Sequence, residues 1–486
     1  MSRKVRFSPP AYILFVLIVL AVFLPPQIAF SLTYEEEREL GRQFFTYIKK
    51  NMKLINDEDI VDYINELGQK ILKSAGPQPF KYRFFIVDQE VTNAFAAPAG
   101  YVFINSGLIM NFESEGQLAA ILAHELAHVT CRHLAERLQR SKMLSLATLG
   151  AVMAGIFIGG EAGSALIIGS AAASMQAELK YTREDEAEAD HKGLDYLVKT
   201  GYDPTFMTQS FRILLRTQWQ GATDVPTYLS THPALSERIS SVEILASALP
   251  EYGKVKGRGD DQAFKAVKTK LVARYGDHLR AQNLFKELIK KERTEGLAHY
   301  GQALLYQKQQ KYRLAVGEFK LALKKEPANT DFLTDYGALL FQQGNYPEAA
   351  TALGRVIILK PDSPRALFYL ARTYQEEGRL ERSKELFQKL LSQKPEHEQG
   401  LYNLGLVYGR LNDLARAHLN TGLYFKVKNK PAKALYHLNK ARKFAASEPP
   451  ELQSRIEQAI KKIKEKEKEK KKRGRPTINP PGTHRR

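Results

Sequence analysis

Two histidines separated by three residues give the clearest chemical signal in this chain of 486 residues. His124 and His128 flank Glu125 in the sequence His-Glu-Leu-Ala-His. On a helix, positions i and i+4 share one face, so both imidazoles can bind one zinc ion, with Glu125 beside its open position. Glu125 would then act as the general base for a water that attacks a peptide carbonyl. The spacing predicts one catalytic Zn²⁺ per chain and hydrolysis of peptide bonds.

A carboxylate further along the chain can complete the ligand set, and six acidic side chains compete for this role. A helix places Glu186 and Asp190 on one face. If Glu186 binds the metal, Asp190 can accept a hydrogen bond from the distal nitrogen of a ligating histidine. Glu184 and Glu188 form a second i, i+4 pair, which is more typical of a solvated face. The candidates are Glu178, Glu184, Asp185, Glu186, Glu188 and Asp190.

Two further side chains near the motif are not expected to bind the metal. In the long three-histidine motif a third histidine stands six residues after the second, but that position is Leu134 and the nearby histidine is His133. Cys131 is the only cysteine, so no intramolecular disulfide can form. A small buried cysteine is the simpler interpretation of this residue. His133 and Cys131 are therefore left out of the site.

Residues 1–31 have the features of a signal peptide. An apolar run at 11–24 follows three basic residues, and small residues precede a cleavage point after Ser31. The alternative is an uncleaved N-terminal anchor, although two prolines interrupt the apolar stretch. In both cases the basic flank stays in the cytoplasm, and we expect the rest of the chain to be exported.

Residues 32–255 are expected to form one domain of helices and a small β-sheet. Apolar residues at helical spacing predict helices, and segments rich in aromatic and β-branched residues predict strands. The predicted helices are 34–53, 57–73 and 115–140, and the predicted strands are 82–87 and 101–104, separated by a loop at 93–100.

The second predicted strand is the candidate for substrate binding. It consists of Tyr101, Val102, Phe103 and Ile104. A strand at the edge of a cleft can pair with an extended peptide through backbone hydrogen bonds and thereby accept many sequences. We therefore expect broad specificity for unfolded chains.

Residues 143–177 form an apolar segment whose single charge, Glu161, lies beside glycines. Each half is short for a membrane span, so a hairpin of two helices is predicted. Three interpretations stay open: a buried helix pair, a cover over the active site, and a segment that enters a membrane interface.

A period of 34 residues begins near residue 262. A period of this length is typical of tetratricopeptide repeats, in which each repeat is a pair of helices. We predict a stack of about four repeats with a capping helix over 262–446, whose concave face would bind a peptide or a protein surface. The recurring positions are Ala281, Ala315, Ala349, Ser383 and Ala417, with Pro327, Pro361 and Pro395 in a second column.

The formal net charge of +19 is concentrated partly near the C-terminus. Residues 451–486 are predicted to be a basic disordered tail, because lysine, glutamate and proline are too polar for a packed core. Arg473-Gly-Arg-Pro476 resembles the AT-hook motif, which binds in the DNA minor groove. In an exported chain, contact with an anionic membrane surface is the preferred interpretation, and nucleic acid is not an expected partner.

These motifs together resemble the HtpX-like and CAAX prenyl protease type of membrane-associated zincins. The resemblance rests on His124–His128, on the acidic segment 183–190, on Asn93-Ala-Phe-Ala and on Ser106-Gly-Leu. It implies a mainly α fold, in which a zincin-like metalloprotease domain of helices and a small β-sheet precedes an α-solenoid of tetratricopeptide repeats.

The resemblance also implies roles for individual residues. Glu186 would be the third zinc ligand and Asp190 the supporting carboxylate. His232, in Thr-His-Pro, would either block the open position in a resting state or stabilise the oxyanion. A structural histidine beside a proline is the alternative. Pro98-Ala99-Gly100 departs from the two glycines typical of the family, so this loop is expected to differ.

The implied function is that of a periplasmic zinc endopeptidase that degrades misfolded or stalled envelope proteins. Its repeats would bind these substrates or the outer-membrane β-barrel assembly machinery, and association with a membrane is kept as an alternative. The competing hypothesis is a chaperone-like adaptor with a gated, mostly inactive zinc site. Substitution of Glu125 separates the two, because only the protease needs a general base.

Overall fold

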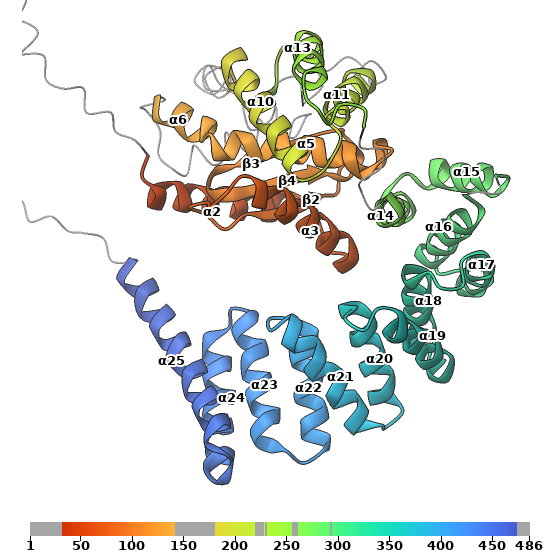
Figure 1. The fold of residues 1–486 in the computed structure, drawn as a ribbon. Helices are drawn as coiled ribbons and strands as arrows, with labels where there is room; N and C mark the ends of the chain where they lie inside the picture. Colours follow the sequence, from red (N-terminus) through yellow and green to blue (C-terminus); the bar gives the residue numbers. More distant parts are fainter. Residues whose placement is uncertain are drawn as a thin grey trace, which may run out of the picture. The chain divides into compact units, whose positions relative to one another are not determined.

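The computed structural model describes residues 32–140, 180–218, 228, 231–254, 261–291 and 294–473. The chain divides into two compact units, Met1–Lys265 and Ala266–Arg486, and each is described by itself (Figure 1). The predicted signal at 1–31 and the predicted hairpin at 143–177 lie outside the described residues. Among the described helices, none is both long and apolar enough to cross a membrane.

The first unit contains a four-stranded sheet with the order β1-β2-β4-β3. β2 runs parallel to β4, whereas β1 and β3 are antiparallel to their neighbours. A short 3₁₀ helix, η1 (Pro98–Gly100), links β3 to β4. The strands are β1 (Leu54–Ile55), β2 (Arg83–Val87), β3 (Ala94–Ala97) and β4 (Tyr101–Asn105).

β4 is an inner strand, so the prediction that it forms the edge of the cleft is wrong. Tyr101, Val102, Phe103 and Ile104 are paired with β2 on one side and with β3 on the other. Their backbone groups cannot also pair with a peptide. Within the described residues, β3 forms one edge of the sheet, where the sequence predicted a loop. Alanine has low strand propensity, and burial of the whole of β3 outweighs it.

Two amphipathic helices pack on opposite faces of this sheet, close to their predicted positions. They are α2 (Tyr34–Asn51) and α3 (Glu58–Ser74). Phe84 and Phe85 are adjacent in β2 and therefore point to opposite faces. The ring of Phe85 lies 4.7 Å from that of Phe45 in α2. The ring of Phe84 lies against Gly68 in α3, where a Cβ atom would be only 2.3 Å away.

The predicted helix at 115–140 is two helices, α5 (Glu115–Thr130) and α6 (His133–Arg140). The short helix α4 (Ser106–Asn111) precedes them. Arg132 has a left-handed backbone (φ 58°), which a helix cannot continue through. Its Nη2 donates to Glu37 Oε2 at 2.9 Å and to the Leu32 carbonyl oxygen at 2.8 Å. These tertiary contacts stabilise the break.

Two helices pack on α5 on the side away from the sheet, and a third helix packs on both of them (Figure 1). They are α10 (Arg183–Lys199), α11 (Thr205–Gln218) and α13 (Leu235–Ser247). Thr182 and Asp185 form a capping box that starts α10. Gly193 lets α10 approach α5 closely, because a Cβ atom there would lie 3.1 Å from the Cα atom of His124.

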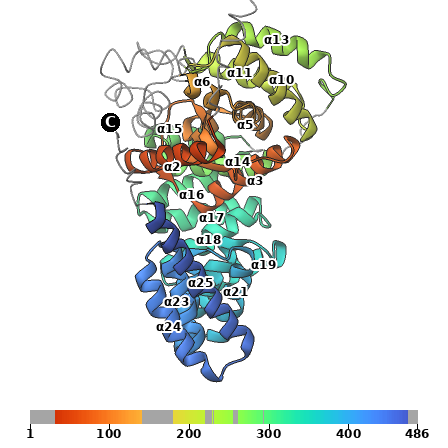
Figure 2. The same cartoon turned by 90° about the vertical axis from the view of Figure 1, so that its left-hand side faces the viewer.

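The second unit is a solenoid of antiparallel helix pairs, as predicted (Figure 2). Its repeats are close-packed through small residues such as Gly301, where a Cβ atom would lie 2.4 Å from the ring of Phe285. The helices are α14 (Asp261–Tyr275), α15 (His278–Ile289), α16 (Glu295–Lys308), α17 (Tyr312–Lys325), α18 (Thr330–Gln342), α19 (Tyr346–Leu359), α20 (Pro364–Glu376), α21 (Leu380–Gln393), α22 (Glu398–Arg410), α23 (Leu414–Val427), α24 (Pro431–Phe444) and α25 (Pro450–Arg473).

A buried carboxylate joins four helices of the solenoid. Asp335 of α18 lies 3.4 Å from Lys270 Nζ and 2.7 Å from Arg274 Nη2, both on α14. Arg365 Nη2 of α20 lies 2.6 Å away, and the Tyr300 hydroxyl of α16 donates to Asp335 at 2.5 Å. The contacts extend beyond neighbouring repeats.

The prediction that 451–486 is a disordered tail is wrong for residues 451–473, which belong to α25. This helix packs an apolar stripe against α23 and α24. Lysine and glutamate occupy its solvated face, where i, i+4 pairs such as Lys461 and Glu465 are common in helices. Residues 474–486 lie outside the described residues. The stripe consists of Leu452, Ile456, Ala459, Ile460 and Ile463.

Candidate active site

The three predicted metal ligands converge from two helices. His124 and His128 of α5 lie with their Nε2 atoms 3.1 Å apart. Glu186 of α10 lies 3.5 Å from His124 Nε2 through Oε2 and 3.7 Å from His128 Nε2 through Oε1. All three side chains are buried. The structure thus brings together donors that are far apart in the sequence.

His232 lies in the same cluster. Its Nδ1 is 2.9 Å from Glu186 Oε1 and 3.5 Å from His124 Nε2. One donor atom from each of the four side chains, including His128, lies within 4.8 Å of the others. Four ligands placed tetrahedrally about 2.1 Å from one ion are about 3.4 Å apart. The observed separations are close to this value, so the donor set fits a transition metal ion that prefers nitrogen and carboxylate ligands.

Asp190 fixes the orientation of His124 from behind. It lies one turn after Glu186, and its Oδ1 is 3.0 Å from His124 Nδ1. A proton on Nδ1 that is donated to Asp190 leaves Nε2 of His124 free for a metal. This is the supporting position predicted for Asp190.

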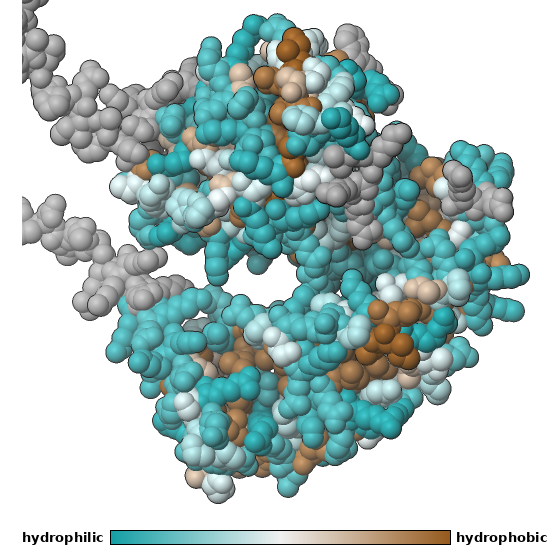
Figure 3. Space-filling model, in the orientation of Figure 1, coloured by the Kyte–Doolittle hydropathy of each residue, from teal (hydrophilic) through white to brown (hydrophobic). Residues whose placement is uncertain are grey.

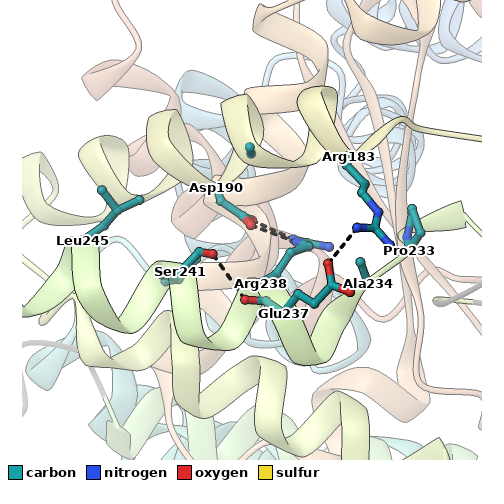
Figure 4. A pocket seen from close by; sticks show the side chains of 10 residues that line it. Arg183, Asp190, Pro233, Ala234, Glu237, Arg238, Ser241 and Leu245 are labelled. Carbon is teal, nitrogen blue, oxygen red and sulfur yellow. Dashed lines mark hydrogen bonds and ion pairs between the residues drawn. The ribbon is translucent and has the colours of Figure 1, made fainter.

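Arg238 of α13 is a site residue that the sequence analysis missed. Its Nε and Nη2 donate to the two oxygens of Asp190, at 2.8 and 2.6 Å (Figure 4). Its Nη1 contacts Glu186 Oε2. A cavity of about 170 Å³ adjoins Arg238 and Asp190, beside the exposed ion pair between Arg183 and Glu237. Two buried carboxylates require a cation, but the sequence does not indicate which basic residue supplies it.

Glu125 has the environment of a proton acceptor. Both its carboxylate oxygens are buried and have no hydrogen-bond partner among the described residues. His232 Nε2 lies 3.6 Å from Glu125 Oε1. Burial raises the pKa of the Glu125 carboxyl. A buried carboxylate without partners gains stability by taking a proton, so Glu125 can accept one from a water in the site.

The metal-free cluster carries its own positive charges. Burial and Arg238 oppose protonation of His124, but hydrogen bonds to Asp190 and Glu186 raise its pKa to about 9. Burial lowers the pKa of His128 well below its ordinary value. Burial also acts against ionisation of Glu186, but His232 and Arg238 hold its pKa well below the ordinary value. Metal binding at His124 would therefore compete with protonation of its ring.

Two tyrosines, also missed in the sequence, hold the imidazoles in place. Tyr181 stacks on His128 with ring centroids 3.9 Å apart, and Tyr228 stacks on His232 at 4.4 Å. Both hydroxyl groups are buried without a hydrogen-bond partner among the described residues. No spacing rule relates these tyrosines to the motif.

β3 reaches the site, whereas the predicted substrate strand does not. A narrow pocket is lined by Ala96 and Ala97 of β3 together with His128 and Tyr181. None of the residues of β4 lines it. The edge of the sheet is therefore the part that adjoins the predicted metal ligands.

A mainly helical fold, in which a helix carries His-Glu-x-x-His and a second helix carries a buried glutamate, defines a metallopeptidase. Residues 61–246 match the model of Peptidase family M48, and residues 300–366 and 340–404 match models of the tetratricopeptide repeat. The chain therefore carries a peptidase family M48 domain followed by tetratricopeptide repeats. The predicted family, fold class and enzyme class are confirmed.

Curated relatives match between 44% and 72% of the chain. A Vibrio cholerae serotype O1 protein, described as a β-barrel assembly-enhancing protease, is 32% identical over 62% of this chain and 63% of its own length. The β-barrel assembly-enhancing protease of Escherichia coli strain K12 is 29% identical over 72% of each chain. The mitochondrial metalloendopeptidase OMA1 of Arabidopsis thaliana is 28% identical over 44% of each chain. Among solved structures, MamA covers 35% of this chain with 19% identity and a TM-score of 0.27.

Proposed function

We propose that this protein is a zinc endopeptidase that cleaves unfolded or misassembled proteins of the cell envelope. The observation that carries the proposal is the buried cluster of His124, His128 and Glu186 beside Glu125, whose carboxylate oxygens have no hydrogen-bond partner among the described residues. Two imidazoles and one carboxylate are the ligand set of catalytic zinc sites. The metal would thus be zinc, one ion per chain.

The side chains would divide the reaction between them. Bound zinc supplies Lewis acidity toward the peptide carbonyl and toward a water. Glu125 would accept the proton of the attacking water and deliver it to the leaving nitrogen. Asp190 would keep His124 in the tautomer that binds through Nε2, since their atoms lie 3.0 Å apart. Of these side chains, only Glu125 would transfer a proton during the reaction.

The substrate would bind along the edge of the sheet. β3 is buried at rest, so an extended peptide would add to it through backbone hydrogen bonds only once its edge is uncovered. Ala96 and Ala97 line the pocket that includes His128, which would place the scissile bond beside the ligands. Backbone pairing is insensitive to side-chain identity, so the specificity would be broad. This proposal replaces the predicted role of β4.

A second candidate is a binding protein whose protease site rests in a closed form. His232 Nδ1 lies among the ligand atoms, 2.9 Å from Glu186 Oε1, and His232 is fully buried. We propose that His232 fills the fourth coordination position in the resting state and leaves it when substrate enters. The chain would then hold partners through its repeats and cleave only some of them.

The solenoid is suited to protein partners. Figure 3 shows apolar side chains gathered on the surface around α19. α19 itself carries two exposed apolar side chains, Ile358 and Leu359, of which 80% and 51% is exposed. Exposed apolar patches mark interaction sites. Because relatives are named for β-barrel assembly, we propose periplasmic β-barrel precursors or their assembly machinery as partners, with contact to the membrane surface as an addition.

The test measures zinc content and degradation of a fluorescein-labelled unfolded casein by the purified chain. Wild type should bind one zinc ion and degrade the casein. Glu125→Gln should keep zinc but lose activity by about 10²–10⁴-fold, which is the rate enhancement that a general base usually provides. Glu186→Ala should lose zinc. Glu184→Gln, which changes an exposed glutamate of the same helix, is the matched control and should resemble wild type.

Two results would contradict parts of this proposal. Full activity of Glu125→Gln would exclude the assigned general base. A wild-type protein that binds zinc but cleaves nothing would exclude the constitutive protease and favour the closed form, which His232→Ala then tests directly.

A further inference from the structure

His133 lies directly behind the metal ligand His128. The left-handed Arg132 ends α5, and His133 begins α6. On an unbroken helix a residue five positions further on would be rotated by about 140°. The break instead brings Nδ1 of His133 to 3.0 Å from Nδ1 of His128. His133 is buried, with 3% of its surface exposed.

The hydrogen bonds around His133 admit one arrangement of protons when His128 binds a metal. The Nε2 atom of His128 faces the ligand cluster, so its proton must reside on Nδ1. That proton is donated to Nδ1 of His133. His133 then carries its own proton on Nε2, which lies 3.3 Å from Glu188 Oε2. Each donor has an acceptor.

Glu188 is held in place from the other side. Lys192, one turn further along α10, lies 2.8 Å from Glu188 Oε1 through its Nζ. The two oxygens of Glu188 therefore have different partners, Lys192 and His133. A carboxylate fixed in this way can orient an imidazole more firmly than a freely rotating one.

We propose that His133 and Glu188 form a hydrogen-bond relay that positions His128 for metal binding. Asp190 does the same for His124 by direct contact. α10 would thus supply the ligand Glu186 and the terminal acceptors for both histidines. The proposal rests on the metal site of the proposed function, and it assigns positioning roles to two side chains that touch neither metal nor substrate.

An alternative use of the same side chains is a second metal site. Donor atoms of Cys131, His133 and Glu188 lie within 4.8 Å of one another. The relay is favoured because Nδ1 of His133 already faces His128. In addition, the ammonium group of Lys192 occupies one oxygen of Glu188 and would repel a further cation.

The test is the zinc affinity of the full chain, measured by competition with a chromophoric chelator, together with the absorption spectrum of the cobalt-substituted protein. His133→Phe keeps a ring but removes the acceptor, and should weaken zinc binding by about 10–100-fold and shift the cobalt bands. His133→Asn restores an oxygen near the position of Nδ1 and should recover most of the affinity. Glu188→Ala should have a smaller effect than His133→Phe.

Control measurements distinguish the loss of the relay from a loss of packing and from the absence of a metal site. His191→Phe changes an exposed histidine of α10 and should leave affinity and spectrum unchanged. Thermal unfolding of the metal-free variants shows whether they are folded. If wild type binds no zinc, the proposed function and the relay that depends on it are both overturned, whereas a loss confined to the His133 variants concerns the relay alone.

Three outcomes would overturn the relay. The first is wild-type affinity and spectrum in folded His133→Phe. The second is an equal loss in His133→Asn, which would assign His133 to packing. The third is a second zinc ion per wild-type chain that Cys131→Ser removes, which would make the cluster a metal site.

Discussion

Arg238 and Asp190 form a bidentate ion pair inside the protein, with Nε to Oδ2 at 2.8 Å and Nη2 to Oδ1 at 2.6 Å. Arg238 also contacts Glu186 through Nη1. One guanidinium group therefore holds both the carboxylate that orients His124 and the carboxylate that is the proposed ligand. Before a metal arrives, Arg238 supplies the cation that these buried anions require.

Arg238→Met should destabilise the metal-free protein by about 3–5 kcal/mol, because it leaves two buried carboxylates without their cation. Zinc should restore part of this loss, since the ion compensates Glu186. Thermal unfolding with and without zinc measures both effects. Arg183→Met is the control, because Arg183 forms an exposed ion pair with Glu237 and its removal should cost less than about 0.5 kcal/mol. Equal effects of the two substitutions would contradict the assigned role.

His232→Ala should raise proteolysis severalfold and weaken zinc binding, if His232 fills the fourth coordination position at rest. The reason is that a water and a substrate carbonyl can then enter without displacing a ligand. Initial rates of casein cleavage and chelator competition provide the two measurements. A fall in kcat with unchanged KM and unchanged zinc affinity would instead assign His232 to transition-state stabilisation.

Gly193→Ala should weaken metal binding although Gly193 is not a ligand. The added Cβ atom would lie 3.1 Å from the Cα atom of His124, so α10 and α5 must separate slightly, which should shift Glu186 relative to His124. We expect a loss of about 1–3 kcal/mol in stability as well. Chelator competition and thermal unfolding measure the two effects.

Gly354→Ala is the matched control, because a Cβ atom at this helical position meets nothing within 4 Å. It should stabilise α19 by about 0.4–1 kcal/mol and leave zinc affinity unchanged. Unchanged zinc affinity in Gly193→Ala would show that α10 can shift without disturbing the ligands.

Asp335→Asn should loosen the solenoid at neutral pH. Burial alone would raise the pKa of Asp335, but Arg365, Lys270 and Arg274 hold it well below its ordinary value. A carboxyl with a depressed pKa contributes stability above its unfolded pKa of about 3.9 and loses it as the pH falls through the folded value. Below about pH 4, the solenoid of the wild-type protein should therefore be less protected from hydrogen exchange. The variant should lack this dependence and should already lose about 3–5 kcal/mol at pH 7.

Hydrogen exchange of peptides from α14 to α20 measures this effect, with labelling at pH 7 and pH 3 and correction for intrinsic rates. Asp362→Asn is the control, since Asp362 is 75% exposed and pairs only with surface residues. Equal protection of wild type and Asp335→Asn at pH 7 would contradict the prediction.

The sequence predicted elements whose pattern is local. α2 and α3 were predicted nearly to their ends, because their apolar residues follow the helical period. β3 was missed, since three of its four residues are alanine and only burial makes them a strand. The break after α5 depends on the contact between Arg132 and Glu37, which lie far apart in the chain. Leu452 and Ile456 of α25 were hidden among charged residues.

In the candidate site, too, residues with a local sequence pattern were predicted and residues that depend on distant contacts were not. His124 and His128 were predicted as ligands from their helical spacing and residue type, and Glu186 was chosen among six acidic candidates by the family resemblance; the structure brings these three side chains together. Arg238, Tyr181 and His133 were missed because their positions depend on how separate segments pack. His133 was considered only as a ligand, and its contact with His128 arises from a turn that no residue pattern indicated.

The contacts of Asp335 also have a mechanical consequence. In most solenoids each repeat touches only its neighbours, so bending is shared evenly along the array. Here α14, α16, α18 and α20 are tied to a single carboxylate. A force applied at α14 is transmitted directly to α20, and this stretch resists bending as one piece.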